Sequence, residues 1–152
     1  MTRQLALAVA LGALTACGES ISPDPIGDYT DLTTEWNRIE TSGPAPGHGD
    51  TIRFIYFNEV ARGMGTRELG AILVKEVYED DGGVPGALRY VAMMRKVRRG
   101  ISPDDEGGWL FSQADTPGGA ESHSDTCWNR CHVQAPVFGV WFDYTQYDRP
   151  TP

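Results

Sequence analysis

Four short runs of β-branched and aromatic residues, separated by turn-forming residues, constrain the fold of this 152-residue chain most. Residues such as Val, Ile, Tyr and Phe favour strands, whereas the Gly, Pro and Asp between the runs favour turns. Connections as short as these join neighbouring strands in antiparallel order. The sequence therefore predicts an α+β fold on an antiparallel sheet of about four to five strands. The runs are residues 51–58, 70–79, 87–99 and 107–115.

Two further segments flank these runs. Residues 28–40 carry large apolar side chains at the spacing of one face of a helix, namely Tyr29, Leu32, Trp36 and Ile39. This spacing predicts a helix before the sheet. Residues 137–144 are apolar and aromatic, and we expect either a last strand or a packed terminal segment there.

The N-terminus predicts export. Arg3 precedes an apolar run, residues 5–16, that is shorter than the roughly 20 residues of a membrane span and is typical of a secretory signal peptide. The ending LTAC resembles a bacterial lipobox, which implies cleavage before Cys17 and a lipid anchor on that residue. An ordinary buried helix is the alternative. The expected organisation is a signal peptide at 1–16, a flexible tether at 17–27 and one domain at 28–152, lipid-anchored to a bacterial membrane on the periplasmic side.

Charge and cysteine content narrow the class of protein. The formal net charge of −8 argues against binding to nucleic acid and against binding to anionic lipid by charge. The chain has three cysteines, and with Cys17 in the anchor the other two form an even pair in an oxidising compartment. The basic run at residues 95–99 is expected to be a solvated face, with partners such as Glu76 or Glu79.

The stretch SDTCWNRCHV brings Cys127, Cys131 and His132 close together. The pattern C-x-x-C-H attaches c-type haem, with the cysteines bonded to the porphyrin and the histidine bound to iron. This chain has C-x-x-x-C-H, and one extra helical residue turns the histidine by about 100° relative to the first cysteine. We therefore expect a short haem-bearing helix near the C-terminus, with an irregular turn within the motif.

Two other interpretations of this stretch stay open. A disulfide between Cys127 and Cys131 would close a very short loop and leave His132 unexplained. A zinc site could use His123 together with Cys127, Cys131 and His132, although adjacent ligands are awkward for a tetrahedral ion.

From the first strand onward the chain resembles the cytochrome P-460 family, which includes the cytochromes c′-beta. The matching pieces occur in order and span residues 29–144: HG at His48, RFIYFN, GAILVKE, MMRK, GGWLF, the C…CH site and VFGVWFDY. The resemblance implies a homodimer with one five-coordinate haem c per chain, held by Cys127 and Cys131 with His132 as the proximal iron ligand. Lys75 matches the lysine that becomes cross-linked to the porphyrin in P-460 members.

The residues around Lys75 bear on that match. Strand alternation places Lys75 on one face with Ala71, Leu73 and Val77, as a charge in an apolar row. A lysine at a sheet edge that extends into solvent is the alternative.

The resemblance also bears on the distal side of the haem. Ala92 falls where hydroxylamine-oxidising members carry a carboxylate, so the general base of that reaction is missing from this position. Four nearby apolar residues are expected to form a distal pocket that suits NO: Met93, Met94, Phe54 and Phe57. Plain packing in the core is the alternative role for most of them.

These observations predict an exported monohaem cytochrome with an open distal site that binds or converts NO or hydroxylamine and meets a redox partner protein. One alternative is a six-coordinate electron carrier, with Met64, Met93, Met94 or His123 as sixth ligand. The other is a haem-free lipoprotein that binds a partner and carries a Cys127–Cys131 disulfide.

Overall fold

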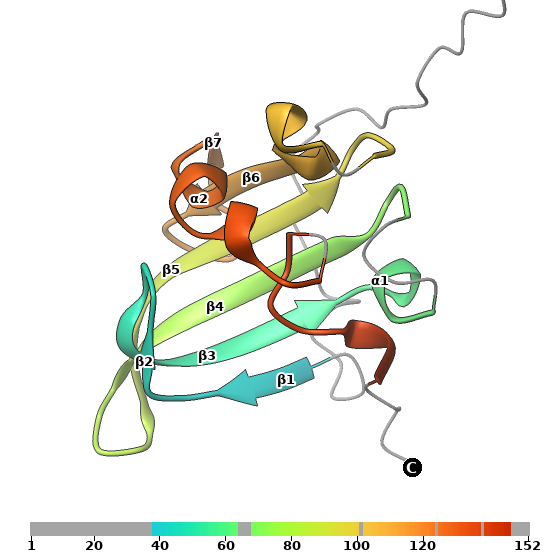
Figure 1. Cartoon of the computed structure of the whole chain (residues 1–152). Coiled ribbons are helices and arrows are strands. Elements are labelled where there is room, and N and C mark those ends of the chain that lie inside the picture. Colours follow the sequence, from blue (N-terminus) through green and yellow to red (C-terminus); the bar gives the residue numbers. More distant parts are fainter. Residues whose placement is uncertain (1–37, 64–67, 101, 124, 138, 147–152) are drawn as a thin grey trace, which may run out of the picture.

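The computed structural model describes residues 38–63, 68–100, 102–123, 125–137 and 139–146. In these residues a seven-stranded antiparallel sheet has the order β1-β3-β4-β5-β6-β7, and β2 pairs with β3 (Figure 1). The strands are β1 (Arg38–Thr41), β2 (Pro44–Ala45), β3 (Gly49–Phe57), β4 (Ile72–Asp80), β5 (Pro85–Lys96), β6 (Trp109–Ala114) and β7 (Ser122–His123). The helices are α1 (Glu59–Gly63), η3 (Pro103–Gly108), α2 (Thr126–Arg130), η4 (His132–Gln134) and η5 (Tyr144–Gln146).

The α+β class and the antiparallel order of the four long strands are confirmed, because β3 to β6 coincide with the four predicted runs. The predicted strand count is too low. The additional strands β1, β2 and β7 are two to four residues long, and segments so short carry no alternating pattern in the sequence. Among the described residues of 137–144, Val137 and Val140 form an isolated bridge and η5 begins at Tyr144. Val140 and Tyr144 are buried, so this part is a packed terminal segment and not a last strand.

The predicted helix at residues 28–40 is wrong at its end, since residues 38–40 belong to β1. Ile39 lies opposite Ile55 of β3, and the guanidinium of Arg38 lies 5.0 Å from the ring centroid of Phe54. Pairing with a buried strand therefore overrides the helical spacing. Residues 28–37, the signal peptide at 1–16, Cys17 and the tether at 17–27 lie outside the described residues. Within the described ranges, no helix has the length and apolar character needed to span a bilayer.

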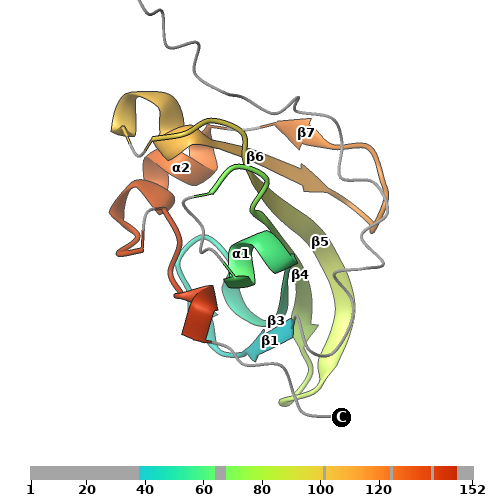
Figure 2. The ribbon, with the colours of Figure 1, turned by 90° about the vertical axis from the view of Figure 1, so that its right-hand side faces the viewer.

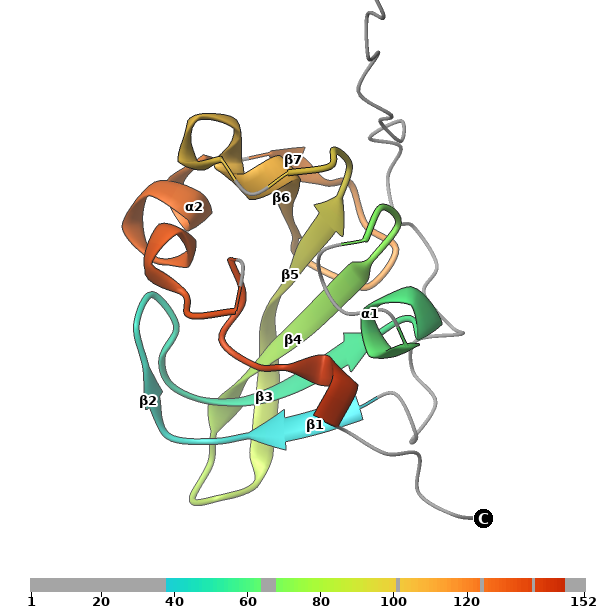
Figure 3. The same ribbon diagram turned by 45° about the vertical axis from the view of Figure 1, so that its right-hand side comes forward.

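The sheet is strongly curved, and α1, α2 and η5 lie inside the curve (Figures 2 and 3). We call the inner face concave and the outer face convex. Side chains alternate between two clusters, as strand geometry requires. The concave face is covered by Ile55, Phe57, Leu73, Trp109 and Phe111 together with Trp128 and Tyr144 from the helices. The convex face carries Tyr56, Val74, Val91, Met93 and Ala114.

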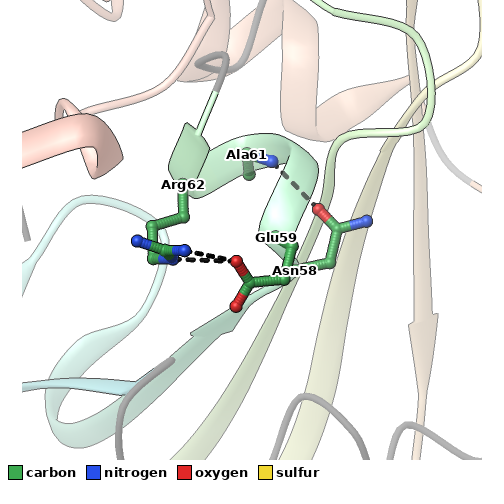
Figure 4. A network of polar contacts seen from close by, with 4 residues as sticks. All are labelled: Asn58, Glu59, Ala61 and Arg62. Atoms are coloured by element: carbon green, nitrogen blue, oxygen red, sulfur yellow. Dashed lines mark hydrogen bonds and ion pairs between the residues drawn. The ribbon is translucent and has the colours of Figure 1, made fainter. Parts of the chain in front are cut away.

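Asn58 fixes the turn from β3 into α1 (Figure 4). Its Oδ1 accepts hydrogen bonds from the backbone N–H of Ala61 and of Ile72, both at 3.1 Å. Its Nδ2 donates to the carbonyl of Gly70 at 2.7 Å. Glu59 and Arg62 form an ion pair along the helix. One side chain therefore caps the helix and ties it to the start of β4.

The basic run at residues 95–99 is a solvated face only at Arg98 and Arg99, because Arg95 and Lys96 are buried. Lys96 is fully buried, and its Nζ donates to the carbonyls of Gly100, at 2.6 Å, and Gly107. Arg95 pairs with Glu121 at 2.7 Å. Burial lowers the pKa of Lys96, and the ammonium holds the loop that precedes β6. Gly108 in this loop must be glycine, because its φ is +75° and a Cβ would lie 2.3 Å from the carbonyl oxygen of Arg98.

Phe57 tests the concave core. The side chain is 1% exposed, and its ring centroid lies 4.9 Å from that of Tyr144. We expect Phe57→Ala to lower the free energy of unfolding by about 3–5 kcal/mol in urea titrations. Val84→Ala, at a residue 62% exposed in the β4–β5 turn, is the control and should change it by about 0.5 kcal/mol or less. A loss below about 1 kcal/mol for Phe57→Ala would contradict the packing described.

Candidate functional site

A cavity of about 430 Å³ lies between the concave face of the sheet and the C-terminal segment. Its volume is within the range of small-molecule and cofactor sites, roughly 300–1,000 Å³. The sheet contributes Ile55, Leu73, Lys75, Tyr90, Ala92, Met94 and Phe111. The facing wall comes from Cys127, Cys131 and His132 and from Val140, Trp141 and Phe142, and the β2–β3 turn adds Gly47 and His48. The cavity therefore brings together predicted site residues from three separate segments: Lys75 of β4, Ala92 and Met94 of β5, and the cysteine motif of α2 and η4.

The cysteine motif contains the irregular turn that we expected. Helix α2 holds Cys127 and ends at Arg130. Cys131 then leaves helical geometry, with φ of −130° and ψ of −57°, and η4 starts at His132. The thiols of Cys127 and Cys131 are both free. The break at Cys131 lets both cysteines and His132 line the same cavity despite the extra residue.

Trp128 attaches this segment to the sheet. It is 6% exposed, and its ring centroid lies 6.2 Å from that of Phe111. Gly139 passes so close that a Cβ there would lie 3.0 Å from the rings of both Trp128 and Trp109. The φ of Gly139 is +88°, which also favours glycine. This close approach positions the backbone carbonyl of Gly139 for the contact with His132 described next.

His132 is held in one tautomer. Its Nδ1 lies 2.7 Å from the carbonyl oxygen of Gly139. Because a carbonyl only accepts, Nδ1 carries the hydrogen and Nε2 keeps its lone pair. Within the described residues, Nε2 has no hydrogen-bond partner. Burial lowers the pKa of His132 to about 4, so the ring is neutral at pH 7. A neutral imidazole whose other nitrogen donates to a backbone carbonyl is the usual form of a metal-binding histidine.

Lys75 lies in the middle of the sheet, opposite Ile55 of β3 and Ala92 of β5. The alternative of a lysine at a sheet edge is therefore wrong. Its Nζ lies 2.8 Å from Nε2 of His48. The pKa of Lys75 is lowered to about 8, chiefly by burial and to a smaller extent by the positive charge of Arg53. A primary amine that changes charge near neutral pH therefore lines the cavity.

His48 was noted in the sequence only as part of an HG pair, yet it belongs to this site. It ends a β-turn in which its N–H donates to the carbonyl of Ala45 at 3.0 Å, and Pro46 and Gly47 occupy the two central positions. Gly47 has a φ of +74°, the positive angle that a Pro-Gly turn of type II requires. His48 Nδ1 lies 2.6 Å from the hydroxyl of Tyr90. Burial, followed by the charge of Lys75, lowers the pKa of His48 to about 3.

Tyr90 was not predicted from the sequence to have a role in the site, although its spacing from Ala92 indicates that both lie on one face of the sheet. It precedes Ala92 by two residues on β5 and therefore shares its face of the sheet. Among the described residues that line the cavity, none is Asp or Glu. At the end of the cavity next to the β2–β3 turn, the hydrogen-bonded polar groups are Lys75, His48 and Tyr90.

The predicted apolar pocket is only partly correct. Met94 lines the cavity, and Met93 borders it while packing in the convex cluster. Phe57 packs within the concave core and is not part of the lining, and Phe54 packs on the convex face, 5.5 Å from Tyr78 between ring centroids. Ile55 and Phe111 take the places expected for the two phenylalanines.

The zinc interpretation finds no support in the geometry. His123 is exposed in β7 and is not among the residues that line the cavity. In the part of the chain that the structure describes, no three His, Cys, Asp or Glu side chains gather to hold a metal ion. Met64, a candidate sixth ligand, lies outside the described residues.

The donor set fits a covalently attached metalloporphyrin. Two thiols that can form thioethers and one imidazole with a fixed tautomer share a wall of a largely apolar cavity. Comparisons with protein-family models, curated proteins and solved structures found no match to this chain. An assignment of function therefore depends on the site itself.

His48 makes acid stability a test of this site. The pKa of His48 is about 3 in the folded protein and about 6.5 when unfolded, so the unfolded chain binds more protons between these values. The free energy of unfolding therefore falls as pH falls from 6.5 towards 3. We expect His48→Gln to recover about 1–2 kcal/mol of the loss between pH 7 and about pH 4.5, measured by urea unfolding. His123→Gln, in exposed β7, should behave as wild type. Equal losses in wild type and His48→Gln would contradict a buried neutral His48.

Proposed function

We propose that this chain is an exported, lipid-anchored monohaem c-type cytochrome whose open distal site binds or redox-converts small nitrogen oxides such as NO and hydroxylamine. The observation that carries the proposal is the arrangement at the cavity wall. Cys127, Cys131 and His132 line one cavity, and the carbonyl of Gly139 leaves Nε2 of His132 as the free ring nitrogen.

The chain's own residues would hold the haem in defined roles. Cys127 and Cys131 would bond to the porphyrin through thioethers, and Nε2 of His132 would bind the iron. The carbonyl of Gly139 keeps the imidazole in the tautomer that binding needs and fixes its orientation. When bound, haem would supply an iron centre that takes up a small ligand and exchanges one electron.

The wall opposite the cysteines favours a small ligand. Ala92 is the smallest side chain on the sheet side of the cavity, and it lies between Lys75 of β4 and Gln113 of β6. Ile55, Leu73 and Met94 add apolar groups to the same wall, which accommodate neutral diatomic molecules such as NO. No carboxylate is present among the described lining residues to take a proton from hydroxylamine, so any proton transfer falls to other groups.

The location and partners form part of the same proposal. The signal peptide and the anchor on Cys17 would place the domain on the periplasmic side of a bacterial membrane. There a redox partner protein would exchange electrons with the haem, and two chains would form a homodimer, as the family resemblance implies.

Two alternatives are distinguishable by the same measurements. Met94 on the cavity wall favours a six-coordinate electron carrier as the second candidate function. The shared position of Cys127 and Cys131 on one wall is also compatible with a haem-free protein in which the two form a disulfide.

Haem attachment is the first test. The full chain, made in a bacterium that matures c-type cytochromes, should give a coloured protein that stains for haem on a denaturing gel. Cys127→Ser with Cys131→Ser should abolish the stain, because no thiol remains to bond to the porphyrin. His123→Gln should leave it unchanged. A colourless wild-type protein with the mass of the bare polypeptide, or of its disulfide form, would refute the proposal.

Coordination is the second test. An open distal site predicts a five-coordinate spectrum and binding of NO in the wild-type protein. A strong iron–methionine absorption band that disappears in Met94→Leu would instead identify the electron carrier. His132→Ala should lose the proximal ligand and change the spectrum while the thioether bonds, and hence the haem stain, persist.

A further inference from the structure

We propose that Lys75, His48 and Tyr90 form a proton relay that connects the cavity to the protein surface, with Lys75 exchanging a proton with the bound ligand. The inference rests on the proposed function, because it assigns a role to residues of the same cavity. The relay would carry out the proton transfer that a carboxylate performs in other sites, since the described cavity lining contains no carboxylate.

Two hydrogen bonds join the three side chains. Lys75 Nζ lies 2.8 Å from His48 Nε2, and His48 Nδ1 lies 2.6 Å from the hydroxyl of Tyr90. An imidazole bonded through both ring nitrogens can accept a proton on one and release a proton from the other. All three residues line the cavity and are partly exposed, and their burial decreases from Lys75 through His48 to Tyr90. The chain of contacts therefore runs from the cavity to a residue that solvent reaches.

The proton steps balance without any further reactant. With Lys75 as an ammonium, Nζ donates to Nε2 of His48 and Nδ1–H donates to the oxygen of Tyr90. Three hops then follow, from Nζ to Nε2, from Nδ1 to the Tyr90 oxygen, and from that oxygen to water. Lys75 ends as a neutral amine, and His48 stays neutral with its hydrogen moved from Nδ1 to Nε2. The reverse sequence recharges Lys75, so the relay serves a ligand that releases or consumes a proton.

The charges around Lys75 suit this role. Burial and then the positive charge of Arg53 of β3 disfavour the ammonium. Arg130 of α2 also lines the cavity, and in the haem-loaded protein the sulfurs of Cys127 and Cys131 are thioethers without charge. Burial keeps His48 neutral, and the positive charges of Lys75, Arg53 and Arg89 act in the same direction. With its pKa near 8, Lys75 holds a proton at neutral pH and can release it. A buried ammonium without a neighbouring carboxylate is easier to deprotonate than a paired one.

The test uses carbon monoxide as a probe on the reduced haem-loaded protein. The C–O stretching frequency, measured by infrared spectroscopy, responds to a nearby ammonium. In wild type we expect the band to shift as pH passes through about 8, the pKa of Lys75. Lys75→Met should give a band that does not change with pH.

A pH jump separates the relay from a lysine that only titrates. After the jump, the C–O band of Tyr90→Phe and of His48→Gln should relax more slowly than wild type by about tenfold or more, because one hop is removed. Tyr78→Phe is the matched control, since this tyrosine donates to Glu76 at 3.1 Å and does not line the cavity. It should relax as wild type does. Tyr90→Phe removes a single oxygen, so it carries the test even if His48→Gln does not fold.

The outcomes separate the two proposals. Equal relaxation rates in wild type, His48→Gln and Tyr90→Phe would overturn the relay, and so would a wild-type band that is independent of pH. An abnormal haemochrome spectrum that reveals a bond between Lys75 and the porphyrin would also overturn it. In each of these cases carbon monoxide still binds and the proposed function stands. A protein that contains no haem overturns the proposed function itself.

Discussion

The burial of Trp128 is the interaction on which the candidate site depends. Helix α2 has five residues, and an isolated helix of this length is not stable in water. Its position therefore comes from tertiary contacts, chiefly the packing of Trp128 against Phe111 and the loop at Gly139. Cys127 and Cys131 flank this anchor on either side in the chain. The same contacts that dock α2 thus set where both thiols point.

A second constraint comes from the curvature of the sheet. A curved sheet gathers the side chains of its inner face, so residues on four strands, β3 to β6, face a common space. Apolar packing fills one end of this space, around Phe57 and Tyr144. At the other end Lys75 stands in an apolar row, and the β2–β3 turn brings His48 over it. The polar end is therefore a product of one strand position and one short turn that lie far apart in the sequence.

Prediction from the sequence succeeded where a single periodic signal decides the structure. The four long strands follow from their composition, and alternation along β4 placed Lys75 on the face with Leu73. It failed where partners distant in the sequence decide. Residues 38–40 pair with β3 instead of continuing a helix. Arg95 and Lys96 are buried because Glu121 pairs with the first and loop carbonyls accept hydrogen bonds from the second.

The candidate site shows the same division. Cys127, Cys131 and His132 are adjacent in the chain, and their spacing predicted both a shared site and a distorted turn. Tyr90 escaped notice because its role depends on His48, which reaches it across a separate turn.

The break in helical geometry at Cys131 has a consequence for how such motifs vary. In a continuous helix, the number of residues between two thiols also dictates the direction of the following imidazole. Here a single non-helical residue makes the two quantities independent, since η4 starts anew at His132 and takes its direction from Gly139. In the proposed haem site, an insertion between the cysteines would therefore leave His132 directed at the iron. It would change the separation of the two thiols, which is the distance that a haem-attaching enzyme would have to accept.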